Sequence, residues 1–298
     1  MTSAAEPADI EPTLASFRGA SGNALAADVY GTTGAPVLLL HGGGQTRHAW
    51  RKTAQIVVSL GYRAYAVDQR GHGDSEWVAD GAYDFTDFGA DARALADTLA
   101  RESGVRPVAV GASLGGMGSL LAEGNHAPVF SALVLVDITP RVDLEGVAKV
   151  RGFMSAHARE GFATVEDAAE AVAAYLPHRP RPKSNEGLKR NLRLHPDGRW
   201  RWHWDPRFLD GRRRLGPGGA DVEHQLVEAA KRIRIPTLLV RGGSSELVQE
   251  QHARDLLTLV PHATYVDVSG ARHMVAGDRN DQFANAIKSF LRNIQDQR

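Results

Sequence analysis

The feature that most constrains the fold of this chain is an alternation of short apolar runs with helical periodicity through its first 140 residues. Strand-like runs are predicted at 37–40, 63–67, 107–110 and 132–136. Between these runs, apolar residues recur every three to four positions, as on the buried face of a helix. Repeated strand–helix units predict an α/β fold with a doubly wound, mostly parallel sheet and helices on both faces. Residues 14–19 and 24–30 are expected to add antiparallel edge strands.

The alternation stops between residues 140 and 225. Helical spacing predicts two helices there, and an irregular segment rich in Pro, Arg and Trp follows them. The strand pattern then resumes at 235–240 and 264–268, before a last helix. We therefore expect a core made of 1–139 and 226–298, interrupted by a helical cap at 140–225.

Composition excludes several classes of protein. The 298 residues include 35 basic and 35 acidic side chains, so the whole chain has no charge that would attract nucleic acid or an anionic membrane. The absence of cysteine excludes disulfides, thiolate metal sites and a cysteine nucleophile, and the histidines lack the close spacing of a metal site. No run approaches the roughly 18 apolar residues of a membrane span. We expect a soluble, cytoplasmic protein that acts on a small molecule without a metal.

One short motif predicts a nucleophile. Gly111-Ala-Ser-Leu-Gly115 fits the pattern Gly-x-Ser-x-Gly, and it lies between a predicted strand and a predicted helix, as the pattern requires. Glycines at both ends allow a sharp turn that exposes the Ser113 hydroxyl. The start of the following helix supplies N–H groups and the positive end of its dipole to a developing oxyanion.

A second glycine-rich turn, His41-Gly-Gly-Gly44, follows the strand at 37–40. Glycines let backbone N–H groups point at an oxyanion without obstruction by a side chain. We predict that the N–H groups of Gly43 and Leu114 form an oxyanion hole. The alternative is a tight structural turn in which His41 only packs.

The general base is expected on a loop late in the chain, after the last strand. His273 fits best, because it would lie at the carboxyl edge of the sheet, where such sheets bind their ligands. A carboxylate must orient the imidazole of this histidine. Glu246, after the strand at 235–240, is the preferred acid, and Asp137, at the end of the strand at 132–136, is the alternative.

The sequence resembles capped α/β-hydrolase-fold enzymes with a serine nucleophile. The resemblance rests on His41-Gly-Gly-Gly44, Asp68-x-Arg-Gly-His-Gly-Asp-Ser75, Gly111-x-Ser-x-Gly-Gly116 and Gly270-x-x-His273, and on the chain order Ser113, Glu246, His273. The family commonly has Asp where Glu246 stands. Epoxide hydrolases and haloalkane dehalogenases of this fold carry Asp at the position of Ser113, so those two reactions are disfavoured.

The resemblance implies a cofactor-free serine hydrolase that cleaves a carboxylic ester, a thioester or a lactone. Three alternatives are a haloperoxidase or perhydrolase without cofactor, a carbon–carbon bond hydrolase, and a ligand-binding protein with a residual triad. The turn at 68–75 is expected to shape a loop beside the site.

Two features of the cap have two interpretations each. Trp200, Trp202 and Trp204 either anchor the cap to the core or line an acyl pocket. The twelve basic residues between 177 and 214 are interpreted as a solvated surface rather than a site for anions.

Overall fold

The central element of this computed structural model, which describes residues 10–210, 220–275 and 280–296, is an eight-stranded sheet with strand order β1-β2-β4-β3-β5-β6-β9-β10. Its strands are β1 (Thr13–Arg18), β2 (Ala24–Tyr30), β3 (Pro36–Leu40), β4 (Arg63–Val67), β5 (Val108–Ala112), β6 (Ala132–Val136), β9 (Thr237–Gly242) and β10 (Thr264–Val268). β1 and β2 pair antiparallel at one edge, and the neighbours from β4 to β10 are parallel. The predicted α/β fold, including its antiparallel edge, is confirmed.

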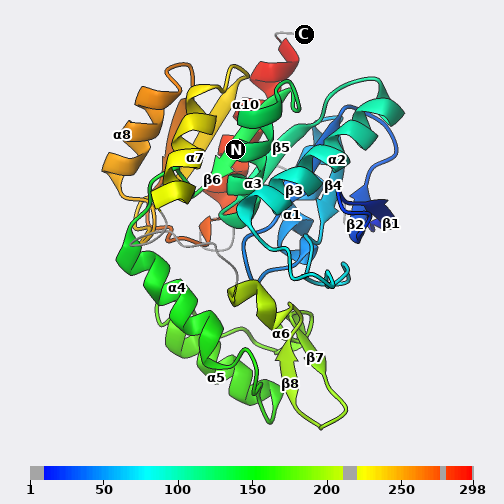
Figure 1. Cartoon of the computed structure of the whole chain (residues 1–298), viewed down its shortest axis with the longest axis vertical. Coiled ribbons are helices and arrows are strands. Elements are labelled where there is room, and N and C mark those ends of the chain that lie inside the picture. Colours follow the sequence, from blue (N-terminus) through cyan, green and yellow to red (C-terminus); the bar gives the residue numbers. More distant parts are fainter. Residues whose placement is uncertain (1–9, 211–219, 276–279, 297–298) are drawn as a thin grey trace, which may run out of the picture.

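Helices cover both faces of the sheet (Figure 1). One face is covered by α2 (Phe85–Ser103), α3 (Leu114–His126), α7 (Ala220–Lys231) and α8 (Glu250–Leu259), and the other by α1 (Arg51–Ser59) and α10 (Asn280–Asp296). Side chains of a strand point alternately to the two faces. In β3, Leu38 and Leu40 therefore pack in the first layer, and Val37 and Leu39 in the second.

The cap contains a β-hairpin as well as helices. Its elements are α4 (Leu144–Ala156), α5 (Val165–Tyr175), α6 (Glu186–Lys189), β7 (Leu192–Leu194), β8 (Trp200–Trp202) and the 3-10 helix η2 (Pro206–Leu209). Figure 1 shows these elements gathered below the sheet. The expected cap boundary at 225 falls inside α7. Because α7 packs so closely on α3 that a Cβ on Gly124 would lie 2.4 Å from the carbonyl oxygen of Ala229, this helix belongs to the core layer.

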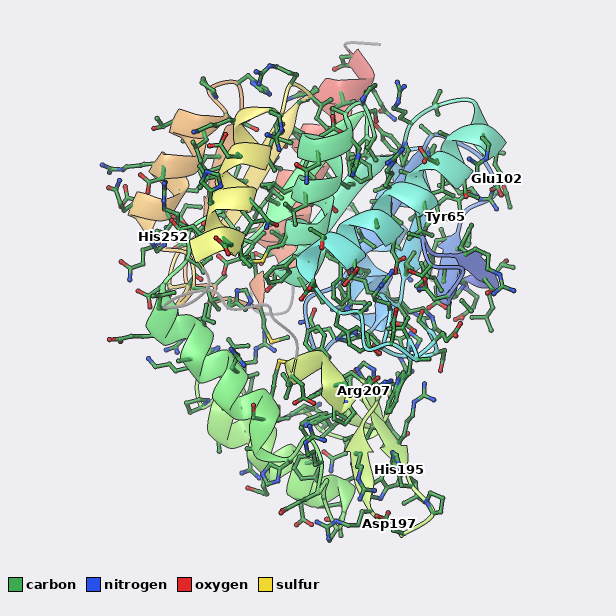
Figure 2. The ribbon with its side chains drawn as sticks, viewed as in Figure 1. Tyr65, Glu102, His195, Asp197, Arg207 and His252 are labelled. Atoms are coloured by element: carbon green, nitrogen blue, oxygen red, sulfur yellow. The ribbon has the colours of Figure 1, made fainter. Side chains whose placement is uncertain are left out.

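Several basic residues of the cap form ion pairs at its surface. Arg201 pairs with Asp197 at 2.6 Å, and Arg181 pairs with Glu170 at 2.5 Å. Figure 2 shows Asp197 at the end of the cap away from the sheet and Arg207 closer to the core. These pairs fit the interpretation as a solvated surface. Arg212, Arg213 and Arg214 lie outside the described residues.

Within the described part of the chain, no helix combines the length and the apolar character needed to cross a membrane.

Candidate active site

Ser113 occupies the corner between β5 and α3, with φ +45° and ψ −109°. A residue other than glycine rarely adopts a positive φ, so the surrounding packing must hold the backbone of Ser113 in this conformation. The flanking glycines make that packing possible. A Cβ on Gly111 would lie 2.5 Å from the carbonyl carbon of Gly115, and a Cβ on Gly115 would lie 2.4 Å from the carbonyl oxygen of Leu40. The corner therefore presents the half-buried Ser113 at the carboxyl edge of the sheet.

His273 lies beyond β10 and is held by Asp137, the residue that follows β6. The distance from His273 Nδ1 to Asp137 Oδ2 is 2.8 Å. Asp137 is fully buried and has a positive φ of +48°. Its Oδ1 accepts a hydrogen bond from the backbone N–H of Gly242 at 2.8 Å, and its Oδ2 accepts another from the Ser245 hydroxyl at 2.6 Å. These bonds fix the carboxylate so that it orients the ring.

Glu246, the acid preferred from the sequence, is not brought to His273. Its Oε2 is buried and has no hydrogen-bond partner among the residues that the structure describes. The loop after β9 instead directs Gly242 and Ser245 at the carboxylate of Asp137. The structure thus joins His273 to the alternative acid. The strand pattern does not separate the two acids, since each follows a fully buried strand.

The two predicted oxyanion donors lie beside the serine corner. Gly43 and Leu114 line the same cavity as Ser113. A Cβ on Gly42 would lie 3.5 Å from the Cβ of Ser113, so the glycine loop approaches the corner closely. Neither the Gly43 N–H nor the Leu114 N–H has a hydrogen-bond partner in the described part of the chain. Both donors are therefore available to a ligand.

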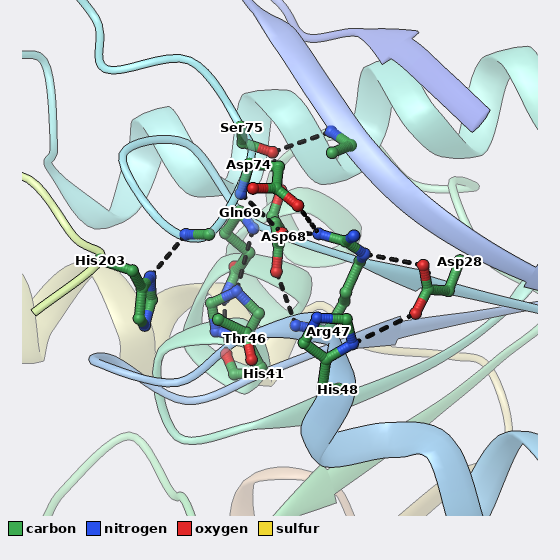
Figure 3. Close-up of polar contacts among 12 residues, drawn as sticks. Asp28, His41, Thr46, Arg47, His48, Asp68, Gln69, Asp74, Ser75 and His203 are labelled. Atoms are coloured by element: carbon green, nitrogen blue, oxygen red, sulfur yellow. Dashed lines mark hydrogen bonds and ion pairs between the residues drawn. The ribbon is translucent and has the colours of Figure 1, made fainter. Parts of the chain in front are cut away.

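Three buried histidines, His41, His72 and His203, accept hydrogen bonds in and beside this glycine loop; Figure 3 shows His41 and His203. The N–H of Gly44 donates to His72 Nε2 at 3.1 Å, and the N–H of Gln69 donates to His41 Nε2 at 3.0 Å. The N–H of Gly73 donates to His203 Nδ1 at 2.6 Å. A ring nitrogen that accepts a hydrogen bond carries no proton, so all three rings are neutral.

Burial acts in the same direction, since it lowers the pKa of His41 and lowers the pKa of His203 to about 4. The turn at 68–75 therefore lies beside the glycine loop at 41–44 and contacts it through His72.

A buried ion-pair cluster, which the sequence analysis missed, holds the 3-10 helix η1 (Arg47–Trp50), which precedes α1, to the same turn (Figure 3). Arg47 Nε donates to Asp28 at 2.8 Å, and its guanidinium also contacts Asp68 and Asp74. Burial alone would raise the pKa of Asp28, but hydrogen bonds from His48 and Arg47 lower it below its usual range. The cluster fixes the segment that follows the glycine loop.

The serine corner opens into a cavity of about 690 Å³ between the core and the cap. Ser113, His273, Gly43 and Leu114 all line it, and most other lining residues are apolar. Trp202 and Trp204 line the cavity and also pack in a hydrophobic cluster that joins cap residues such as Phe162 to core residues such as Phe88. Trp200 packs against that cluster but does not line the cavity. A mostly apolar cavity with a few convergent polar groups is typical of a small-molecule site.

The sequence of this chain matches a family model and several characterised proteins. A family model described as "alpha/beta hydrolase fold" matches residues 35–279. The chain is 29% identical to the esterase Rv0045c of Mycobacterium tuberculosis over 96% of this chain and 93% of the relative. It is 30% identical to a 2-(acetamidomethylene)succinate hydrolase of Mesorhizobium japonicum, over 86% and 88% of the two chains. It is 29% identical to the non-heme chloroperoxidase CPO-A1 of Kitasatospora aureofaciens, over 87% and 92%.

Solved structures agree with these sequence matches. A crystal structure of E-2-(acetamidomethylene)succinate hydrolase superposes with a TM-score of 0.78 at 25% identity, covering 94% of this chain and 99% of that one. A structure of the M. tuberculosis esterase Rv0045c gives a TM-score of 0.71 at 27% identity, covering 96% and 92%.

Proposed function

This chain belongs to the α/β-hydrolase fold family, and from that premise we propose that it is a serine hydrolase that cleaves carboxylic esters through an acyl-enzyme. Relatives in this family include both esterases and a chloroperoxidase, so membership alone leaves the reaction open. The observation that carries the proposal is the 2.8 Å hydrogen bond from His273 Nδ1 to the buried Asp137, at the cavity that Ser113 also lines.

In the proposed reaction, His273 Nε2 removes the proton of the Ser113 hydroxyl, which attacks the ester carbonyl. The oxyanion that forms accepts hydrogen bonds from the N–H groups of Gly43 and Leu114. The alcohol leaves with the proton from His273, and water activated by the same ring then releases the acid. Asp137, in place of Glu246, holds the ring in the required tautomer.

The Ser113 hydroxyl has no hydrogen bond to another described residue, so the unliganded site is not yet in its reacting geometry. Catalytic hydrogen bonds often tighten only when substrate binds. We propose that the ester, held by the apolar wall and the two N–H donors, brings the hydroxyl and His273 Nε2 within hydrogen-bonding distance. Thioesters and lactones present the same electrophilic carbonyl to this arrangement.

The test is the hydrolysis of p-nitrophenyl butyrate by the wild-type protein, Ser113→Ala and Ser155→Ala. Removing the nucleophile should lower kcat/KM by at least about a thousandfold. Ser155 is an exposed serine of the cap, so its replacement controls for the loss of a serine hydroxyl elsewhere. A fluorophosphonate probe should label Ser113, as located by mass spectrometry. Wild-type turnover by Ser113→Ala would refute the proposal.

The chloroperoxidase relative makes perhydrolysis the second candidate. In that reaction hydrogen peroxide replaces water in the attack on the acyl-enzyme, and a peracid leaves. Peroxide-dependent halogenation in the presence of acetate, compared with ester hydrolysis by the same preparation, separates the two activities.

A further inference from the structure

The charged residues that line the cavity in the described part of the chain are all basic. They are Arg51 and Lys52 from the first turn of α1, and Arg151 from α4 of the cap. No aspartate or glutamate occurs among the described residues of the lining, although the whole chain has as many acidic as basic residues. The cavity therefore carries a local positive charge, although the chain as a whole has a net charge of zero.

Two of these cations have no partner among the described residues. Arg51 pairs with Glu11 at 2.7 Å, but Lys52 and Arg151 form neither an ion pair nor a hydrogen bond with any residue that the structure describes. Other cations of the cap, such as Lys149 and Arg190, also lack a partner among the described residues, but they do not line the cavity. Lys52 and Arg151 are also exposed, whereas Ser113 is half-buried, so both lie at the rim of the cavity.

An apolar cavity with unpaired cations at its rim is complementary to a ligand with a hydrocarbon body and a negatively charged end. We propose that the substrate is an ester that carries an anionic group, a carboxylate in the simplest case, and that Lys52 and Arg151 bind this group. The inference rests on the proposed ester hydrolysis and specifies its substrate class. One cation comes from the core and the other from the cap, so such a substrate would contact both parts.

The experiment compares two esters of equal chain length, mono-p-nitrophenyl glutarate and p-nitrophenyl valerate. The wild-type protein should have the higher kcat/KM for the glutarate ester. Replacing both cations, as Lys52→Ala/Arg151→Ala, should lower the glutarate-to-valerate ratio five- to tenfold, mainly through KM, because exposed ion pairs are individually weak. Raising the salt concentration to 0.5 M should reduce the wild-type preference through screening.

The matched control is Arg106→Ala/Lys149→Ala. It removes the same net charge at two exposed positions outside the cavity, and Lys149 lies on the same helix as Arg151. This control should keep the wild-type ratio. An equal loss in both double variants, or no wild-type preference for the glutarate ester, would overturn the inference while leaving ester hydrolysis intact.

A binding measurement separates this inference from the proposed reaction. Ser113→Ala protein is titrated with monomethyl glutarate and with methyl valerate, and quenching of tryptophan fluorescence is followed, since Trp202 and Trp204 line the cavity. The anionic ester should bind at least fivefold more tightly, and Lys52→Ala/Arg151→Ala should remove the difference. Equal affinities would refute the anion site even if no ester is hydrolysed.

Discussion

Asp137 and Glu246 differ in their surroundings more than in their chemistry. Asp137 receives hydrogen bonds from Gly242, Ser245 and His273 at distances of 2.6 to 2.8 Å, so its carboxylate is fixed although it is fully buried. Glu246 has a buried oxygen without a partner among the described residues. A carboxylate that is already oriented stabilises a positive ring without further rearrangement. The proposed role of the acid therefore belongs to Asp137.

Asp137→Asn should lower kcat/KM for p-nitrophenyl butyrate by roughly a thousandfold to ten-thousandfold. The amide keeps the acceptor for Gly242 but favours the wrong tautomer of His273. Glu246→Gln is the matched control and should change kcat/KM by less than about threefold. The thermal unfolding midpoints of both variants show whether they fold. A larger loss of kcat/KM in the Glu246 variant would indicate that Glu246, rather than Asp137, orients His273.

At this scale the sequence locates Ser113 and His273 because their signals are local. A serine between two glycines at a strand–helix junction is recognisable from a few residues, and one late loop histidine fits the chain order. The choice between two carboxylates has no local signal, since both follow strands that the sequence predicts. The choice depends on whether the loop after β9 directs its hydrogen-bond donors at Asp137, and this is a property of the tertiary structure.

At the scale of elements, the junction between β5 and α3 depends on the close approach of backbones. Gly115→Ala would place a methyl group 2.4 Å from the carbonyl oxygen of Leu40, and backbone cannot yield as a flexible side chain can. The substitution should lower the free energy of unfolding by about 1–3 kcal/mol and displace the Leu114 N–H. Urea denaturation and kcat/KM measure the two effects.

The control for this substitution is Gly152→Ala in the exposed part of α4. A Cβ there meets nothing within 4 Å, and alanine favours the helix over glycine by about 1 kcal/mol. This variant should be as stable as the wild type or more so. If both alanines destabilise the protein equally, close packing at the corner is not the cause.

The predicted elements that proved correct are continuous apolar runs of four to five residues and helices with a long periodic pattern. The run at 132–136 matches β6, and the apolar face of Phe283 and Ile287 lies within α10. The hairpin of β7 and β8 was not predicted: Trp200, Trp202 and Trp204 alternate as on one face of a strand, but strands of three residues are too short for the sequence to show how they pair. Its position also depends on a pairing between Phe162 and Trp200, which are far apart in the sequence.

At the scale of the whole molecule, buried polar contacts join the cap to the core. His203 of the cap accepts a hydrogen bond from the N–H of Gly73, and its other ring nitrogen faces the carbonyl oxygen of Gly44 at 3.4 Å. Asp205 accepts a hydrogen bond from the hydroxyl of Tyr83 at 2.7 Å. The contact of His203 with Gly44 reaches the glycine loop, so the placement of the cap and the geometry of the proposed oxyanion hole are coupled.

The buried contact between His203 of the cap and Gly73 of the core should make the stability of the protein depend on pH. Burial lowers the pKa of His203 from 6.5 to about 4, so between these values the unfolded chain binds a proton that the folded protein excludes. The free energy of unfolding should therefore fall as the pH is lowered through this range, by about 3 kcal/mol in total, since each pKa unit corresponds to about 1.4 kcal/mol. The lowered pKa of His41 acts with the same sign.

Urea denaturation of the wild-type protein and His203→Asn at pH 7 and pH 4.5 isolates the contribution of this histidine. Asparagine places its Oδ1 near the position of the ring Nδ1, so it can still accept the hydrogen bond from Gly73 but does not titrate. The wild-type protein should lose about 2–3 kcal/mol more than the variant between the two pH values. Carboxylates titrate in both proteins and cancel in this comparison. Equal losses of unfolding free energy would mean that His203 is not held neutral between the cap and the core. The placement of the cap would then have to depend on the other contacts.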